Sequence, residues 1–267
     1  MVICFVLLVI RNMFTQAHRA RQLLQEEQLV ESDPNMHTYN WSNLSWNNGF
    51  PSYEDDTYTS VIGIDVSSHQ KSIDWVAVKN SGVKFAMIQV GYRGYETGAL
   101  MDDAYFEENI QGAIENGIDV GVYFFSQAIT VEEAREEANF VLQQLRKAGI
   151  TELELPVAFD LEPSPDYSGR ADNLSPAETN AIARAFCTTI QEAGYRVIVY
   201  GNKVDLNRFD LVSLNEPIWL AQYVDEPDVN FNFLIWQYTS TGQVDGITGS
   251  VDLNLDFSNV SSSKNPQ

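Results

Sequence analysis

The apolar residues of this chain gather into short runs from residue 60 onward, and polar segments of helical length separate the first five runs. Near-continuous apolar runs of this kind are typical of strands in a parallel sheet that is covered on both faces. The pattern predicts eight strands, at residues 61–66, 84–90, 119–125, 155–160, 196–200, 218–222, 233–238 and about 251–257.

The segments between these strands carry helix start and stop signals. Thr130 and Glu133 form a capping-box pattern that opens a helix ending at Gly149, and a second such pattern at Ser175 opens a helix ending near Gly194. Three more helices are expected at residues 73–81, 102–117 and about 203–209. Five βα units followed by three strands predict an irregular TIM-like α/β barrel, (β/α)5(β)3. The alternative is an open doubly wound sheet, but no glycine-rich phosphate loop follows the first strand.

The residues before the first strand have a different character. Residues 1–30 form a hydrophobic N-terminal segment followed by a short polar helix at 16–30, and residues 31–59 are rich in Asn, Ser and Asp and are predicted to be a linker. The apolar run at the N-terminus is too short to span a bilayer, so we interpret it as a truncated signal anchor. We interpret Trp41 and Trp46 as spacer residues. The folded domain is expected at residues 60–260, with a tail at 261–267.

The composition excludes several classes of function. A net charge of −21 over 267 residues argues against nucleic acid or an anionic membrane surface as the main partner. The two cysteines, Cys4 and Cys187, lie in different contexts, so no disulfide is expected between them. With three histidines and no CxxC motif, the chain has little from which to build a zinc site. We therefore expect neither a metal nor another cofactor.

Acidic residues fall where a βα barrel places its active site, at the carboxyl ends of the strands. Asp65 lies near the end of the first strand, and the fourth ends in "LPVAFDLEP", which contains Asp160 and Glu162. Alternate residues of a strand share a face, so these two carboxyl groups should lie roughly 6–7 Å apart along the chain. Such proximity raises their pKa values and has few structural uses. Asp252 falls near the start of the last segment, where the strand-end rule does not bring it to the barrel mouth.

Carboxyl groups without His or Cys suit two chemistries, namely glycoside hydrolysis and Mg²⁺- or Mn²⁺-dependent phosphoryl chemistry. The second usually needs basic residues or a phosphate loop, and Lys and Arg total only 16. We interpret His69 as a hydrogen-bonded turn residue rather than a metal ligand. Aromatic residues near the strand ends are candidate sugar platforms, namely Tyr92, Tyr95, Tyr123, Phe125, Tyr200, Tyr223, Trp236 and Tyr238. Carbohydrate is therefore the favoured substrate class.

Seven stretches in order resemble the glycoside hydrolase family 25 lysozymes, which are N-acetylmuramidases. They are "GIDVSSHQKSIDW", "FAMIQVGYRGYETG", "DDAYFEENIQGAIENGIDVGVYFFSQAIT", "LPVAFDLEP", "FCTTIQEAGYRVIVYGN", "IWLAQY" and "WQYTSTGQVDGITGSVDLN". The resemblance covers about residues 60–257 and implies the same irregular barrel. It also implies cleavage of the β-1,4 bond between N-acetylmuramic acid and N-acetylglucosamine in peptidoglycan.

The resemblance implies roles for particular positions. Glu162 matches the catalytic acid and Asp160 its partner, while Asp65 and Asp252 match two further acids of the groove. Tyr123, Trp236 and Gln237 match positions that line the substrate cleft, and we add Tyr92 and Tyr223. We expect a monomer outside the cell or in its wall, with the N-terminal segment as a candidate membrane tether. A peptidoglycan-binding module without activity and a metal-dependent phosphoesterase are the alternatives.

Overall fold

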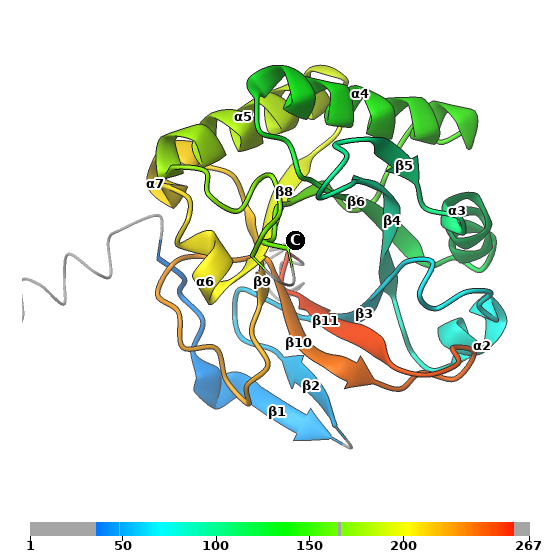
Figure 1. Ribbon diagram of the computed structural model, residues 1–267. Coiled ribbons are helices and arrows are strands. Elements are labelled where there is room, and N and C mark those ends of the chain that lie inside the picture. Colours follow the sequence, from blue (N-terminus) through cyan, green and yellow to red (C-terminus); the bar gives the residue numbers. More distant parts are fainter. Residues whose placement is uncertain (1–35, 48, 165–166, 259–267) are drawn as a thin grey trace, which may run out of the picture. The chain divides into compact units, whose positions relative to one another are not determined.

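The computed structural model describes residues 36–47, 49–164 and 167–258, which belong to two compact units. The smaller unit contributes residues 36–39 and 230–232, where Met36 bridges Phe231. The larger unit, Asn40–Val229 with Phe233–Gln267, contains all the helices and strands named below (Figure 1). The expected helix at 16–30 and the tail at 261–267 lie outside the described residues.

Eight strands of the larger unit close into a barrel, which confirms the predicted fold (Figure 1). Around the barrel they pair in the order β3, β11, β10, β9, β8, β7, β6 and β4, and the pairing of β3 with β4 closes the ring. A short ninth strand, β5 (Leu100–Asp102), adds antiparallel to β4. The barrel strands are β3 (Val61–Val66), β4 (Phe85–Arg93), β6 (Asp119–Phe125), β7 (Val157–Asp160), β8 (Val197–Asn202), β9 (Ile218–Ala221), β10 (Ile235–Gly242) and β11 (Val251–Asp256).

The helices follow the first five barrel strands, as the sequence predicts. They are α2 (Trp75–Asn80), α3 (Phe106–Glu115), α4 (Val131–Lys147), α5 (Pro176–Glu192), α6 (Lys203–Leu206) and α7 (Leu211–Leu214). The capping box at Ser175 and Glu178 is reciprocal. At α4 the Thr130 side chain accepts from Glu133 N (3.1 Å), but the Glu133 carboxylate accepts from Ile129 N (2.8 Å), so that box is only half formed.

The last strand runs in the opposite direction to its neighbours, which the sequence analysis did not foresee. Strand β11 is antiparallel to both β10 and β3 because only a turn connects it to β10. Its first residues therefore lie beside the carboxyl end of β3, and Asp252 pairs directly with Asp65. This reversal brings Asp252 to the barrel mouth.

Part of the expected linker is folded. A 3-10 turn, η1 (Trp41–Asn43), leads into a hairpin of β1 (Leu44–Asn47) and β2 (Phe50–Tyr53). The Trp41 ring stacks on Phe233 with centroids 6.2 Å apart, and Trp46 packs edge-on against Tyr238 at 5.6 Å. The spacer interpretation of both tryptophans is therefore wrong. Their large apolar surfaces are stabilised by burial against other aromatic rings.

The barrel interior is filled by side chains from the strands and from the segment before β7. Its buried cluster consists of Phe85, Met87, Leu155, Ala158, Ile198, Trp219 and Ile235. Tyr123 and Tyr200 pack against this cluster. The interior is thus a packed core, as in other βα barrels, and the acids at the strand ends lie above an aromatic layer.

Candidate active site

A cavity of about 420 Å³ opens at the carboxyl ends of the parallel strands. All four acids singled out in the sequence line it, namely Asp65, Asp160, Glu162 and Asp252. None of the other described residues that line it is a lysine or an arginine. Like charges therefore meet here without a lysine or arginine on the wall, and protons have to relieve the repulsion.

Asp65 is held by side-chain amides at the end of β3. Its Oδ2 atom accepts hydrogen bonds from Gln237 Nε2 (2.9 Å) and Asn254 Nδ2 (2.7 Å), and Asn254 in turn accepts from Trp219 Nε1 (2.8 Å). Burial and the neighbouring charge of Asp252 raise the pKa of Asp65 well above its usual value, against these bonds. The position of Asp65 is therefore set by a buried network.

Asp160 and Glu162 form a second pair of carboxyl groups. Asp160 ends β7 and is buried, and its Oδ1 atom has no hydrogen-bond partner among the described residues. Burial and the charge of Glu162 raise the pKa of Asp160 well above its usual value. Burial, followed by the charges of Asp205 and Asp252, raises the pKa of Glu162 to about 7, although a hydrogen bond with Asp160 opposes the shift. The pair can thus hold a proton near neutral pH.

Asp205 is an acid that the sequence analysis missed. It lies in the first turn of α6, where Asn202 caps the helix, and its side chain accepts a hydrogen bond from Asn202 Nδ2. After burial, Asp205 is the largest cause of the raised pKa of Glu162. The sequence signal is an acid in "YGNKVD", within the short helix that follows the fifth predicted strand.

The loop after β6 supports Glu162 from its backbone. Gln127 Nε2 donates to the carbonyl oxygen of Glu162 (2.8 Å). The loop itself is anchored on Glu137 of α4, whose carboxylate accepts from Ser126 Oγ (2.6 Å) and from Arg93 Nε (2.7 Å). A buried ion pair between β4 and α4 therefore holds the loop that hydrogen-bonds the backbone of Glu162.

The predicted substrate-binding residues occupy different places. Tyr92, Tyr123 and Gln237 line the cavity. Tyr223 does not line it, but its hydroxyl donates to Gln237 Oε1 (2.9 Å). Trp236 is fully buried and its indole donates to Gln222 O (2.7 Å), so the structure does not bring it to the cavity.

Other wall residues were not identified as ligand contacts from the sequence. These are Gln89 and Trp219, which line the cavity from β4 and β9. Tyr200 of β8, a candidate sugar platform from the sequence, also lines the cavity and donates its hydroxyl to Gln237 Oε1 (2.9 Å). His69 lies in a turn, as expected, and its charge partly offsets the burial that raises the pKa of Asp252. Inward-facing polar residues in the middle of a strand carry no sequence signal that separates them from core residues.

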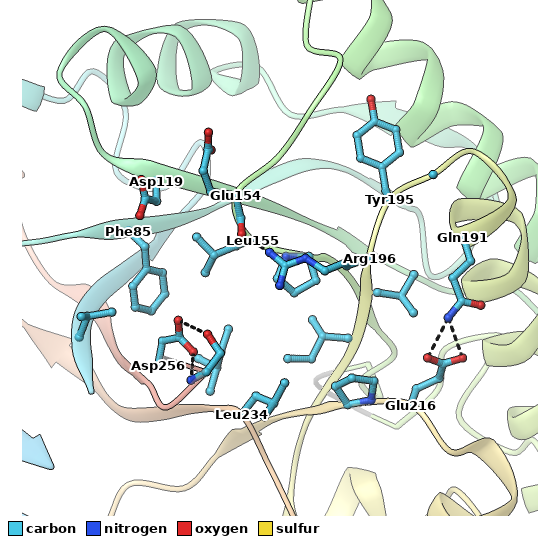
Figure 2. A pocket seen from close by; sticks show the side chains of 18 residues that line it. Phe85, Asp119, Glu154, Leu155, Gln191, Tyr195, Arg196, Glu216, Leu234 and Asp256 are labelled. Atoms are coloured by element: carbon cyan, nitrogen blue, oxygen red, sulfur yellow. Dashed lines mark hydrogen bonds between the residues drawn. The ribbon is translucent and has the colours of Figure 1, made fainter. Parts of the chain in front are cut away.

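A larger cavity, of about 530 Å³, lies at the opposite end of the barrel (Figure 2). Its acids have local partners: Glu216 accepts from Gln191 Nε2 (3.1 Å), and Asp256 accepts from Ser258 N (2.8 Å). Arg196, on the same wall, donates to Glu154 O. We place the candidate active site at the smaller cavity because the carboxyl pairs meet there.

None of the helices in residues 36–47, 49–164 and 167–258 has the length and apolar character needed to cross a membrane. Within these ranges, no group of three or more His, Cys, Asp or Glu side chains is arranged to hold a metal ion.

A closed α/β barrel with paired carboxyl groups at its mouth is an arrangement that suits glycoside hydrolysis. The model of the glycosyl hydrolases family 25 matches residues 64–247. The chain therefore belongs to glycosyl hydrolases family 25.

Relatives of this chain include bacterial lysozymes. The autolytic lysozyme of Clostridium acetobutylicum is 29% identical over 198 residues, which cover 72% of this chain and 54% of that protein. The crystal structure of the bacterial lysozyme from Streptomyces coelicolor matches with a TM-score of 0.61 and 28% identity, covering 74% of this chain and 92% of the other. The autolysin LytC from Streptococcus pneumoniae, solved with a synthetic peptidoglycan ligand, matches in fold with a TM-score of 0.68 and 24% identity. That match covers 80% of this chain and about half (52%) of LytC.

Proposed function

We propose that this protein is an N-acetylmuramidase that cleaves the β-1,4 bond between N-acetylmuramic acid and N-acetylglucosamine in peptidoglycan, with Glu162 as its general acid. The observation that carries the proposal is the position of Glu162 beside Asp160 at the barrel mouth, in a cavity that is also lined by Asp65 and Asp252. Burial and the nearby charges of Asp205 and Asp252 raise the pKa of Glu162 to about 7, so a protonated fraction persists at neutral pH. A carboxylic acid in that state can donate a proton to a leaving group.

The reaction follows from this proton. Glu162 gives its proton to the glycosidic oxygen while the bond from that oxygen to C1 of the muramic acid breaks, so N-acetylglucosamine leaves as an alcohol. The ionised Glu162 then takes a proton from the water that attacks C1, and the acid is restored. The new end is a reducing muramic acid. The remaining carboxyl groups, Asp65, Asp160 and Asp252, supply negative potential where the sugar becomes positively charged.

Two routes for stabilising the cationic sugar fit these residues. Asp160 can attack C1 as a nucleophile, or the 2-acetamido group of the substrate can attack while a neighbouring carboxylate orients it. The two routes require different separations between the carboxyl groups and different positions of the carboxyl groups relative to the sugar.

The surroundings of the acids support a sugar substrate. We propose that Tyr92, Tyr123 and Gln237 contact the glycan directly, and that Tyr223 acts at the edge of the cavity through its hydrogen bond to Gln237. We further propose that the protein works as a monomer outside the cell or in its wall, with residues 1–30 as a membrane tether and residues 60–260 as the catalytic domain.

The direct test is digestion of purified peptidoglycan by the full chain in buffer containing chelator, beside the Glu162→Gln variant. New reducing ends are reduced with borohydride and identified by mass spectrometry. We expect muramitol ends from the wild type and a loss of about 10³-fold or more in the variant, because proton donation and its reversal both depend on Glu162.

Two other outcomes would assign a different function. Intact glycan with the wild-type protein bound to the wall would favour a binding module. Activity that disappears with chelator and returns with Mg²⁺ or Mn²⁺ would favour metal-dependent chemistry at the same acids.

A further inference from the structure

A third cavity, of about 500 Å³, lies between the β1–β2 hairpin and strand β10. We call it the hairpin cavity, and its lining includes Trp46, Phe50, Tyr223, Thr239, Thr241 and Gln243. We propose that the hairpin cavity is a second sugar-binding site, which holds units of the same glycan chain beyond those at the four acids. This proposal rests on the muramidase function proposed above.

Trp46 provides a fixed aromatic platform in this cavity. Its side chain is 42% exposed, yet its indole Nε1 donates to Asp225 O (3.1 Å). The ring also stands nearly perpendicular to Trp236 and Tyr238, with interplanar angles of 89° and 86°. A half-exposed ring that is held on three sides loses little conformational freedom when a ligand stacks on it.

The rest of the lining combines apolar residues with neutral hydrogen-bonding groups and is almost uncharged. Thr239 and Thr241 present hydroxyl groups, Gln243 presents an amide, and Phe50 adds a second aromatic ring. Asp225 is the single carboxyl side chain among the described residues of the lining. Aromatic rings beside neutral hydrogen-bonding groups suit the hydroxyl and acetamido groups of amino sugars. The cavity at the four acids suits a ligand that becomes positively charged, whereas the hairpin cavity suits uncharged groups of a sugar.

Tyr223 connects the two cavities. It is 55% exposed and lines the hairpin cavity, while its hydroxyl donates to Gln237 Oε1 (2.9 Å), and Gln237 lines the cavity at the four acids. The hydrogen bond between Tyr223 and Gln237 places the two cavities close enough for one polymer chain to reach both. Residues 44–53 lie outside the match to family 25, which begins at residue 64. The hairpin is thus an addition to the part of the chain that the family model covers.

The test measures binding rather than turnover. Full-length Glu162→Gln protein is titrated calorimetrically with peptide-free glycan chains of four and of eight sugars, with and without Trp46→Ala. We expect Trp46→Ala to raise the Kd for the octasaccharide by about fivefold to tenfold, because an aromatic platform is lost. The Kd for the tetrasaccharide should change by less than about twofold, because Trp46→Ala leaves the cavity at the barrel mouth as it is in the Glu162→Gln parent.

Two further variants keep the test independent of folding. Thr241→Val preserves shape but removes a hydroxyl group of the same cavity, and it should weaken octasaccharide binding by about twofold to threefold. Val212→Ala, at an exposed position of α7, should change neither Kd.

The proposal is overturned if Trp46→Ala leaves octasaccharide binding unchanged, or weakens both chains equally. An effect seen only with fragments that carry stem peptides would also overturn it, in favour of a peptide site. Failure of the muramidase function has a separate signature: the wild type would release no reducing ends while the length-dependent effect of Trp46→Ala persisted. Cleavage by the wild type without that effect would reject the second sugar site alone.

Discussion

At the scale of single residues, the site depends on carboxyl groups that burial makes costly to ionise. Asp65 is opposite Asp252, and Asp160 is beside Glu162. No described lysine or arginine lines the same cavity. Such a cluster carries its protons to higher pH than free carboxyl groups do. It also favours a ligand that becomes positively charged, as a sugar does when its glycosidic bond breaks.

We expect Asp205 to raise the pKa of Glu162 without contacting the substrate. Replacing it by asparagine removes a negative charge near Glu162, so the ionised form of Glu162 becomes easier to form and its pKa falls. We expect the alkaline limb of the pH profile of kcat/KM to move to lower pH, by up to about one unit. The measurement is the rate of wall digestion from pH 4 to pH 9.

A matched control distinguishes this electrostatic effect from a change in surface charge. Glu192→Gln, at the exposed end of α5, also removes one negative charge, but far from the barrel mouth. It should not shift the alkaline limb of the pH profile of kcat/KM. If Asp205→Asn lowered activity equally at every pH, its role would be structural rather than electrostatic.

At the scale of elements, strand direction decided which parts of the site could be predicted. Asp65, Asp160 and Glu162 follow from the rule that barrel sites lie at strand ends, because their strands are parallel. Asp252 could not be placed this way, since the antiparallel course of β11 depends on the turn before it. The apolar runs predicted all eight barrel strands to within a few residues.

The hairpin was missed for a different physical reason. Trp41, Trp46 and Tyr53 are separated by polar residues without the alternation of a half-buried strand. What holds the segment is contact with distant aromatic residues such as Phe233 and Phe257, and a local pattern does not record such contacts. Tertiary packing here overrides the polar composition.

The ion pair between Arg93 and Glu137, beneath the β6–α4 loop, should matter for stability mainly because each charge compensates the other. Burial raises the pKa of Glu137 to about 7 even beside Arg93, so in Arg93→Met this side chain either stays buried as an unpaired charge or takes up a proton. We expect a loss of up to roughly 3–5 kcal/mol in the free energy of unfolding. The double variant Arg93→Met/Glu137→Met should recover part of that loss, because neither charge is left unpaired. Urea unfolding of the wild type, both single variants and the double variant measures the coupling.

The activity of the same variants tests the link from this ion pair to the site. Since Gln127 holds the Glu162 backbone from the loop that Glu137 anchors, the double variant should be folded but less active. Full activity in a stable double variant would show that the loop keeps its position without the pair.

At the scale of the whole molecule, the cost of the buried acids should appear in the stability of the fold. The pKa of Glu162 is about 7 in the folded chain, against a usual value of 4.5. Between these two pH values the folded state binds more protons than the unfolded state, so stability falls as pH rises. The contribution of Glu162 is fully present below about pH 4.5 and is lost by about pH 7, and it amounts to at most about 3 kcal/mol.

Comparison with Glu162→Gln isolates this contribution. The net charge of −21 also grows more repulsive as pH rises, but that repulsion acts on both proteins almost equally. We expect the variant to melt several degrees above the wild type at pH 8 and within about a degree of it at pH 4.5, since glutamine has no proton to lose. A difference in Tm that stayed constant between these pH values would mean that Glu162 titrates normally. The same proton would then be absent at neutral pH, so this melting experiment also tests the acid on which the proposed reaction depends.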